Sequence, residues 1–170
     1  MDILKTAIDW AKAELVSTPF FALCGLVFIG LSIGFWQYGK TDLARAYIIP
    51  TAVAGLFLVV VGVGLYYTNT QRIAQFETAY QEDSTAFVEA ELKRAEATLK
   101  EYKNIVFTAI PLIIVACALL LFFLSSPNWR ASMITTIAML AVILLIDGMA
   151  HARIDQYHKA LLEAWSQVKQ

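Results

Sequence analysis

Four apolar stretches without charged side chains alternate with polar helical segments along the chain. The clearest one, from Ala131 to Ile146, has sixteen residues without an ionisable side chain and lies between Arg130 and Asp147. This is close to the roughly 20 residues that a helix needs to cross about 30 Å of hydrocarbon at about 1.5 Å per residue. The pattern predicts four membrane spans, at residues 20–38, 46–68, 104–125 and 131–150.

Polar or amphipathic helices are predicted on either side of the spans. Near the start of the chain, apolar side chains recur at three- and four-residue steps, and Pro19 marks a break. In the middle, a turn-like segment ends where Asp83 or Ser84 would cap the next helix. That helix intersperses acidic and basic residues, which is typical of a solvated face. The predicted helices outside the spans cover residues 1–18, 69–81, 85–103 and 151–169.

The two halves of the chain contain matching segments. The segment RAYIIPT, which starts at Arg45, matches RASMITT, which starts at Arg130, and RIAQF at Arg72 matches RIDQY at Arg153. Because each half crosses the membrane twice, both copies have the same orientation. The predicted fold class is an all-α integral membrane protein with four transmembrane helices, a cytoplasmic helical hairpin and amphipathic terminal helices. Its two tandem two-span repeats are residues 1–83 and 84–170.

The distribution of positive charges predicts the orientation. Three basic residues, Lys40, Arg45 and Arg130, fall in the two turns at one end of the predicted bundle. The other ten fall near the termini and the polar hairpin: Lys5, Lys12, Arg72, Lys93, Arg94, Lys100, Lys103, Arg153, Lys159 and Lys169. Because short loops rich in lysine and arginine stay in the cytoplasm, both termini and the hairpin are predicted to be cytoplasmic.

Composition supports the membrane class and argues against several others. Of the 170 residues, 59% are hydrophobic and only 16% are charged, an apolar share above that of ordinary soluble domains. The formal net charge of −1 provides no basic surface for nucleic acid. Cys24 and Cys117 fall in apolar runs, where a thiol behaves as a small hydrophobic group. We therefore predict neither a disulfide nor a cofactor.

Small, aromatic and basic residues in and beside the spans provide candidate contact positions. Gly30 and Gly34 form a small-xxx-small pair, and such a face meets either the second span or another subunit. Arginine and tryptophan near the ends of spans are typical interface anchors. The candidate helix-packing residues are Gly25, Gly30, Gly34 and Gly55, and the candidate anchors are Arg45, Arg72, Arg130, Arg153, Trp36 and Trp129.

One stripe of side chains near the end of the fourth span carries candidate chemistry. Asp147, His151, Asp155 and His158 follow one another at steps of four, four and three residues, which places them on one face of a continuous helix. Metal sites use imidazoles and carboxylates. However, a stripe on one helix needs ligands from elsewhere, and Gly148 is expected to interrupt the helix. No metal site is assigned, and pairing with arginine at a hydrated boundary is the alternative.

Four segments of the chain resemble a known family: YIIP, EYKNIVF, WRASMITTIAM and AHARIDQYHKAL. They are similar to sequences of a family of uncharacterised small bacterial four-span inner-membrane proteins. The resemblance covers nearly the whole chain. It implies a place in the bacterial inner (plasma) membrane, and it supplies no activity and no site residue.

These patterns favour a non-enzymatic protein that acts through protein–protein interaction in or next to the membrane, for example an immunity or accessory protein. Its expected partners are the lipid bilayer and either further copies of the chain or a membrane-associated protein, and no nucleic acid. The alternative is a homo-oligomeric pore with either the glycine-lined first span or the threonine-bearing fourth span at the channel, and Thr135 and Thr136 are lining candidates. A metal-dependent membrane protein ranks third. The spacing of Arg153 and His158 also fits HEPN-type ribonucleases, although such a short pattern occurs often by chance.

Overall fold

The computed structural model describes residues 3–168 as helices joined by short turns. Residues 1–2 and 169, at the ends of the predicted terminal helices, lie outside the described residues. Four segments are long and apolar enough to cross a membrane, which confirms the predicted all-α class: Ile3–Tyr38, Asp42–Glu82, Ser84–Phe123 and Pro127–Gln167. The helices are α1 (Ile3–Ser17), α2 (Pro19–Tyr38), α3 (Asp42–Ala46), α4 (Ile48–Glu82), α5 (Ser84–Glu101), η1 (Tyr102–Ala109), α6 (Ile110–Phe123) and α7 (Pro127–Val168).

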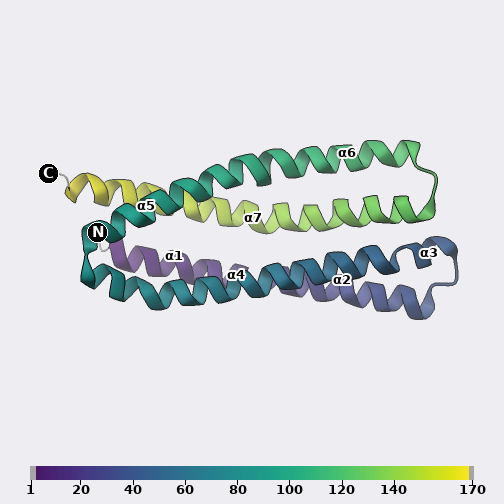
Figure 1. The fold of residues 1–170 in the computed structure, drawn as a ribbon, viewed down its shortest axis with the longest axis horizontal. Coiled ribbons are helices and arrows are strands. Elements are labelled where there is room, and N and C mark those ends of the chain that lie inside the picture. Colours follow the sequence, from purple (N-terminus) through teal and green to yellow (C-terminus); the bar gives the residue numbers. More distant parts are fainter. Residues whose placement is uncertain (1–2, 169–170) are drawn as a thin grey trace.

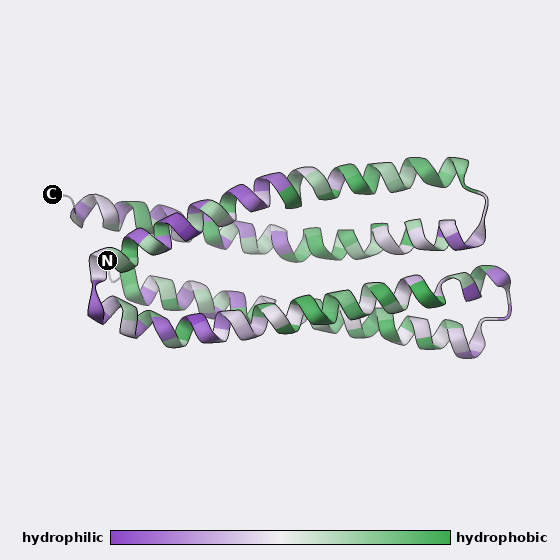
Figure 2. Cartoon of the chain, viewed as in Figure 1, coloured by the Kyte–Doolittle hydropathy of each residue, from purple (hydrophilic) through white to green (hydrophobic). Residues whose placement is uncertain are grey.

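The long helices run along a common axis (Figure 1). The turns from α2 to α4 and from α6 to α7 lie at one end, and the start of α1, the α4–α5 turn and the end of α7 lie at the other. Figure 2 shows that hydrophilic residues concentrate toward the second end, whereas hydrophobic residues dominate α2, α6 and the adjoining parts of α4 and α7. We name the second end, formed by α1, α5 and the C-terminal parts of α4 and α7, the polar end.

The break predicted at Pro19 is slight. Thr18, between α1 and α2, keeps helical dihedral angles of φ −61° and ψ −35°, and its backbone N–H bonds to Glu14 O at 3.0 Å. A proline in the first turn of a helix costs no hydrogen bond within the helix, because its missing N–H would lack an acceptor there. α1 and α2 therefore follow one another as one long segment.

The turn between the first two spans contains a helix that the sequence pattern did not predict. α3 begins after Thr41, whose side chain accepts a hydrogen bond from the backbone N–H of Ala44 at 3.1 Å. α4 then starts at Ile48 and continues to Glu82. Asp83 caps the next helix as predicted: its carboxylate accepts hydrogen bonds from the backbone N–H groups of Thr85 and Ala86, both at 2.9 Å.

An eight-residue π-helix, η1, joins α5 to α6. Within and after it, hydrogen bonds reach back five residues, from the backbone N–H of Ile110 to Ile105 O and from the Thr108 hydroxyl to Lys103 O at 2.7 Å. Pro111 follows directly and has no N–H to donate. The π-helical turns of η1 thus lie where the segment Ser84–Phe123 changes from the polar helix α5 to the apolar helix α6.

α7 is a single helix of 42 residues. The expectation that Gly148 interrupts it is wrong. A glycine inside a helix costs about 1 kcal/mol relative to alanine, and tertiary packing compensates for a cost of this size. Beyond Gly148, Ile154 and Leu161 of α7 are buried in the core of the polar end.

Three glycines bring α2 and α4 into backbone contact. A Cβ atom added at Gly25 would lie 2.7 Å from Gly55 O, and one added at Gly55 would lie 2.7 Å from Gly25 O. At Gly62 the same atom would lie 2.7 Å from the backbone nitrogen of Ala22. Two of the candidate packing residues, Gly25 and Gly55, therefore join the first and second spans within one chain.

The other two candidate packing residues have no neighbour in the described part of the chain. A Cβ atom added at Gly30 or Gly34 would meet no atom within 4 Å. The candidate anchors Trp36 and Trp129 are also exposed, with 72% and 58% of their surface accessible. This part of the molecule is where surrounding hydrocarbon, its interface or another subunit would make contact.

Two hydrophobic clusters hold the helices together. The smaller one lies in the apolar part and centres on Phe21, Leu58 and Ile146, from α2, α4 and α7. The larger one lies at the polar end and combines α1, α4, α5 and α7: Ile3, Ala7, Trp10, Ala11, Phe76, Phe87, Val88, Ala95, Ile154, Tyr157 and Leu161. The polar end is thus a four-helix bundle with its own core.

Candidate functional site

A charged residue lies inside the polar end. Glu91 of α5 is buried, with 8% of its surface exposed. Its carboxylate accepts hydrogen bonds from Arg94 Nε and from the Tyr157 hydroxyl, both at 2.9 Å. A carboxylate is tolerated in such a place only when it is paired and hydrogen-bonded. These two partners, from α5 and α7, therefore hold Glu91 in position.

Trp10 of α1 lies against the same residues. Its ring stacks on Tyr157, with the centroids 5.0 Å apart and the planes within 8° of each other. The guanidinium carbons of Arg94 and Arg72 lie 4.5 Å and 5.5 Å from the Trp10 centroid, within the range of cation–π attraction. We name Trp10, Arg72, Glu91, Arg94 and Tyr157 the polar-end cluster. All four helices of the bundle contribute to it.

Burial shifts the pKa of two members of the cluster. It raises the pKa of the Tyr157 hydroxyl well above its usual value, and the negative charge of Glu91 raises this pKa further. Tyr157 therefore stays protonated and donates its hydrogen bond to Glu91. Burial also lowers the pKa of Arg72, and the positive charge of Arg94 acts in the same direction.

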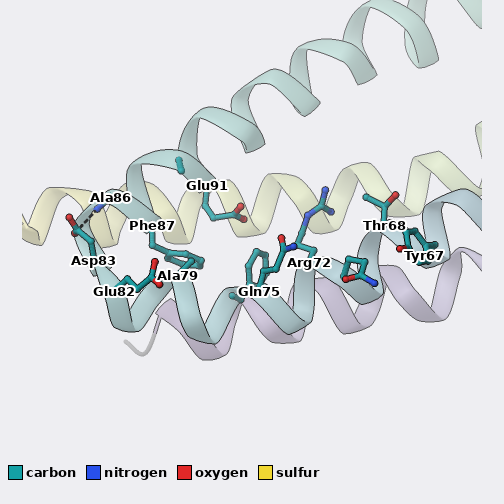
Figure 3. A pocket seen from close by; sticks show the side chains of 13 residues that line it. Tyr67, Thr68, Arg72, Gln75, Ala79, Glu82, Asp83, Ala86, Phe87 and Glu91 are labelled. Atoms are coloured by element: carbon teal, nitrogen blue, oxygen red, sulfur yellow. Dashed lines mark hydrogen bonds between the residues drawn. The ribbon is translucent and has the colours of Figure 1, made fainter.

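A groove of about 650 Å³ opens between α4 and α5 beside this cluster (Figure 3). Arg72 and Glu91 line it together with Phe76 and Phe87, whose rings meet edge to face at 5.5 Å. The rest of the lining is mostly polar: Tyr67, Thr68, Gln71, Gln75, Ala79, Glu82, Asp83, Ala86 and Ala90. The groove therefore offers an arginine, carboxylates, amides and aromatic rings, and arginine and aromatic residues are enriched at protein interfaces.

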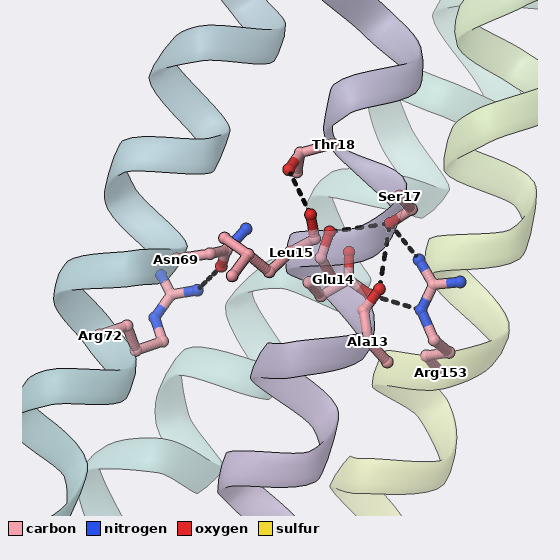
Figure 4. A network of polar contacts seen from close by, with 8 residues as sticks. All are labelled: Ala13, Glu14, Leu15, Ser17, Thr18, Asn69, Arg72 and Arg153. Carbon is pink, nitrogen blue, oxygen red and sulfur yellow. Dashed lines mark hydrogen bonds and ion pairs between the residues drawn. The ribbon is translucent and has the colours of Figure 1, made fainter.

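A second polar network connects α1 to α7 (Figure 4). Arg153 donates hydrogen bonds from Nε to Glu14 Oε1 at 2.9 Å and from its terminal nitrogen to Ser17 Oγ at 2.7 Å. Arg72 of α4 donates to Asn69 Oδ1 at 2.8 Å. Both arginines, which the sequence marks as interface anchors, are thus bonded within the protein. Their anchoring role stays a prediction.

The other two candidate anchors, Arg45 and Arg130, have corresponding positions at the opposite end. Arg45 Nε donates to Gly39 O at 3.2 Å, directly after α2. Arg130 donates to Leu121 O at 3.1 Å and Leu124 O at 3.3 Å, at the end of α6. The last carbonyl groups of a helix lack donors and carry partial negative charge. Each guanidinium therefore stabilises the end of the preceding helix.

The two histidines of the candidate metal stripe face different neighbours. The His151 ring packs edge-on against Phe107, with the centroids 4.9 Å apart. His158 Nε2 lies 3.7 Å from Glu96 Oε1 of α5. Because Arg153 bonds to α1 while His158 faces α5, the two residues of the ribonuclease-like spacing do not converge on one site.

The two carboxylates of the stripe are also separated. Asp155 accepts a hydrogen bond from Lys159 Nζ at 2.6 Å, and this bond lowers the pKa of Asp155. Asp147 lines a cavity nearer the apolar part. In residues 3–168 no three histidine, cysteine, aspartate or glutamate side chains form a group that could hold a metal ion. Although the four residues share one helix face, they do not form a set of metal ligands in the described residues.

The sequence pattern did not identify the polar-end cluster. The prediction that the charged helix presents a solvated face is wrong for Glu91, which is buried. The sequence does contain an indication that Glu91 is buried. Glu91 lies four residues from both Phe87 and Ala95, so it falls within the apolar stripe of the helix. Arg94, three residues later, is its partner on the same helix.

We found no matching protein-family model, curated protein or solved structure for this chain. The resemblance to small bacterial four-span membrane proteins therefore stays a prediction.

Proposed function

We propose that the chain is a non-enzymatic multi-pass membrane protein that binds a protein partner at its polar end. The α4–α5 groove is the observation that carries this proposal. Its volume of about 650 Å³ and its mixed lining suit a short segment of another protein. Both walls are fixed, because Asp83 caps α5 and Phe76 packs against Phe87 across the groove.

In this proposal the protein lies in the bacterial inner membrane, with the polar end in the cytoplasm. The excess of lysine and arginine near the termini and the α4–α5 hairpin supports this orientation. The corresponding contacts of Arg45 and Arg130 support an origin from two tandem repeats. An immunity protein or an accessory protein is a concrete example of this function, since such a protein acts by binding to a partner protein.

Site-specific photocrosslinking in intact cells tests the groove. A photoreactive phenylalanine at Gln75 lies in the groove, and the same residue at Glu163 lies on an exposed part of α7 and serves as the control. We expect a discrete crosslinked product from Gln75 and none from Glu163. Ala90→Trp, which fills the groove from an exposed position, should abolish the product. Equal products at both positions, or no product at Gln75, would contradict the proposal.

A homo-oligomer that forms a pore is the second candidate. The open space beside Gly30 and Gly34 favours it, because small residues on a lipid-facing helix allow another helix to approach closely. Thr135 is not a lining residue of such a pore, since only 4% of its surface is exposed. A closed ring in mild detergent, lost in Gly34→Leu, together with ion flux from liposomes would support this function. A monomer without flux would exclude it.

A further inference from the structure

A cavity of about 510 Å³ lies between the two hairpins in the apolar part of the molecule. We name it the hairpin cavity. Phe57 and Val61 of α4 line it on one side, and Leu140 and Ile143 of α7 on another. Its volume is in the range of small-ligand sites, roughly 300–1,000 Å³. In the described residues α7 contacts α4, whereas α6 contacts α7 and η1 but not α4, so the cavity lies beside the α4–α7 contact.

The lining of the hairpin cavity changes from apolar to polar along its length. Thr98, Glu101, Tyr102 and Asp147 line the part nearest the polar end. Met139, which lines the deeper part, precedes Asp147 by eight residues on α7, and this spacing corresponds to about 12 Å along the helix axis. An apolar chamber with polar groups at one end is complementary to an amphiphile.

The charged groups at this polar mouth are both carboxylates. Within the described residues neither Glu101 nor Asp147 forms an ion pair, and the nearby Arg153 is bonded to Glu14 and Ser17. Carboxylates at the edge of a membrane span are costly unless they meet a cation or a hydrogen-bond donor. The mouth is therefore complementary to an ammonium group.

The π-helix η1 contributes one wall of the hairpin cavity. Tyr102, Ile105 and Val106 all belong to η1 and all line the cavity. Single turns of π-helix are rare and often occur at functional sites, because they displace side chains from regular α-helical positions. The π-helical turns therefore lie beside the cavity between the two hairpins.

We propose that the hairpin cavity holds an acyl chain of a bilayer lipid whose headgroup carries a primary ammonium group. The chain lies against Phe57, Val61 and Ile143, and the ammonium group lies at the carboxylates of Glu101 and Asp147. The bilayer is the source of the occupant, since the cavity lies between helices that are long and apolar enough to cross a membrane. This site is separate from the α4–α5 groove and does not depend on its role.

The first test needs no variant. The full chain is reconstituted in vesicles of phosphatidylglycerol mixed with either phosphatidylethanolamine or phosphatidylcholine of the same acyl chains, and retained lipid is counted by native mass spectrometry. The ethanolamine ammonium donates hydrogen bonds to carboxylates, whereas choline cannot. We expect phosphatidylethanolamine to be retained about tenfold better than the other two lipids. Equal retention of all three, no retained lipid, or a lipid-free dimer that closes the cavity would overturn the proposal.

Two pairs of variants locate the bound lipid. Ile143→Trp fills the cavity, while Leu145→Trp adds the same ring on the same helix at a position with 72% of its surface exposed. Asp147→Asn removes a charge at the mouth, and Glu89→Gln removes one from an exposed position on α5. We expect Ile143→Trp to abolish retention, Asp147→Asn to reduce it about tenfold, and both controls to keep it.

The variants also have outcomes that contradict the site. Normal retention by Ile143→Trp, with helix content unchanged by circular dichroism, would show that the lipid lies elsewhere. Loss of retention in Leu145→Trp would indicate general binding to the apolar surface. If Ile143→Trp does not fold, the comparison of lipid headgroups with the unmodified chain still tests whether the cavity binds the lipid.

Discussion

The two apolar hairpins share an arginine contact at their turns but pack differently. In both, an arginine bonds to carbonyl groups at the end of the preceding helix, Arg45 after α2 and Arg130 after α6. However, α2 and α4 touch through Gly25 and Gly55, whereas α6, with the sequence IPLIIVACALLLFF, has no glycine. Lipid is as apolar as a leucine side chain, so small residues decide how closely two membrane helices approach. The first hairpin is therefore joined by glycine contacts that the sequence of α6 does not offer.

The largest expected effect breaks the close contact of the first hairpin. Gly55→Leu places a side chain where even a Cβ atom would lie 2.7 Å from Gly25 O, so we expect a loss of about 3 kcal/mol in the free energy of unfolding. Gly148→Leu in the second hairpin is the control, because a Cβ atom there meets nothing within 4 Å. Reversible unfolding in mixed micelles measures both. Equal losses of unfolding free energy in Gly55→Leu and Gly148→Leu would show that the first hairpin does not depend on its glycine contact more than the second.

α1 and α5 occupy corresponding positions in the predicted repeats. Each carries a carboxylate bonded to an arginine, and Glu91 and Glu14 have 11% and 12% of their side-chain surface exposed. Glu91→Gln should cost about 2 kcal/mol, because it weakens bonds from both Arg94 and Tyr157. Glu14→Gln should cost about 1 kcal/mol. The same unfolding assay applies, and a larger cost for Glu14→Gln would reverse the expected ranking.

A smaller difference is expected from two buried hydroxyl groups. Ser32 on α2 donates a hydrogen bond across the first hairpin to Ile48 O at 2.7 Å. Thr135 on α7 is buried, and its hydroxyl has no hydrogen-bond partner within residues 3–168. Ser32→Ala should cost about 1 kcal/mol, whereas Thr135→Val should leave stability unchanged or raise it. Destabilisation by Thr135→Val would point to a partner for that hydroxyl outside the chain.

The smallest difference between matched variants is expected at the outer turns. Arg130→Ala removes two hydrogen bonds to carbonyl groups and Arg45→Ala removes one, all at exposed positions. We expect losses of about 1 kcal/mol for Arg130→Ala and about 0.5 kcal/mol for Arg45→Ala. Hydrogen exchange of the backbone amides in the two turns measures this local effect. No change at either turn would mean that the corresponding contacts do not support the helix ends.

Local sequence patterns predicted the helices well, but they did not predict the contacts between the helices. Uncharged runs located four apolar helices, and the residues before α5 located the cap at Asp83. The predicted interruption at Gly148 is wrong, because packing at the polar end keeps α7 helical. Spacing showed that His151 and His158 share a helix face, but not that one meets Phe107 and the other Glu96. Partners on other helices are set by rotation and tilt, which a linear pattern does not contain.

The sequence by itself determined that this protein is a set of long apolar helices with polar extensions, because hydrophobicity and helix propensity act over a few neighbouring residues. Only the tertiary structure decided which glycines meet, that Glu91 is buried beside Trp10 and Tyr157, and that a cavity with a carboxylate mouth lies between the two hairpins. The physical reason is that these features depend on contacts between segments far apart in the chain. Their geometry follows from how side chains of different sizes fit together.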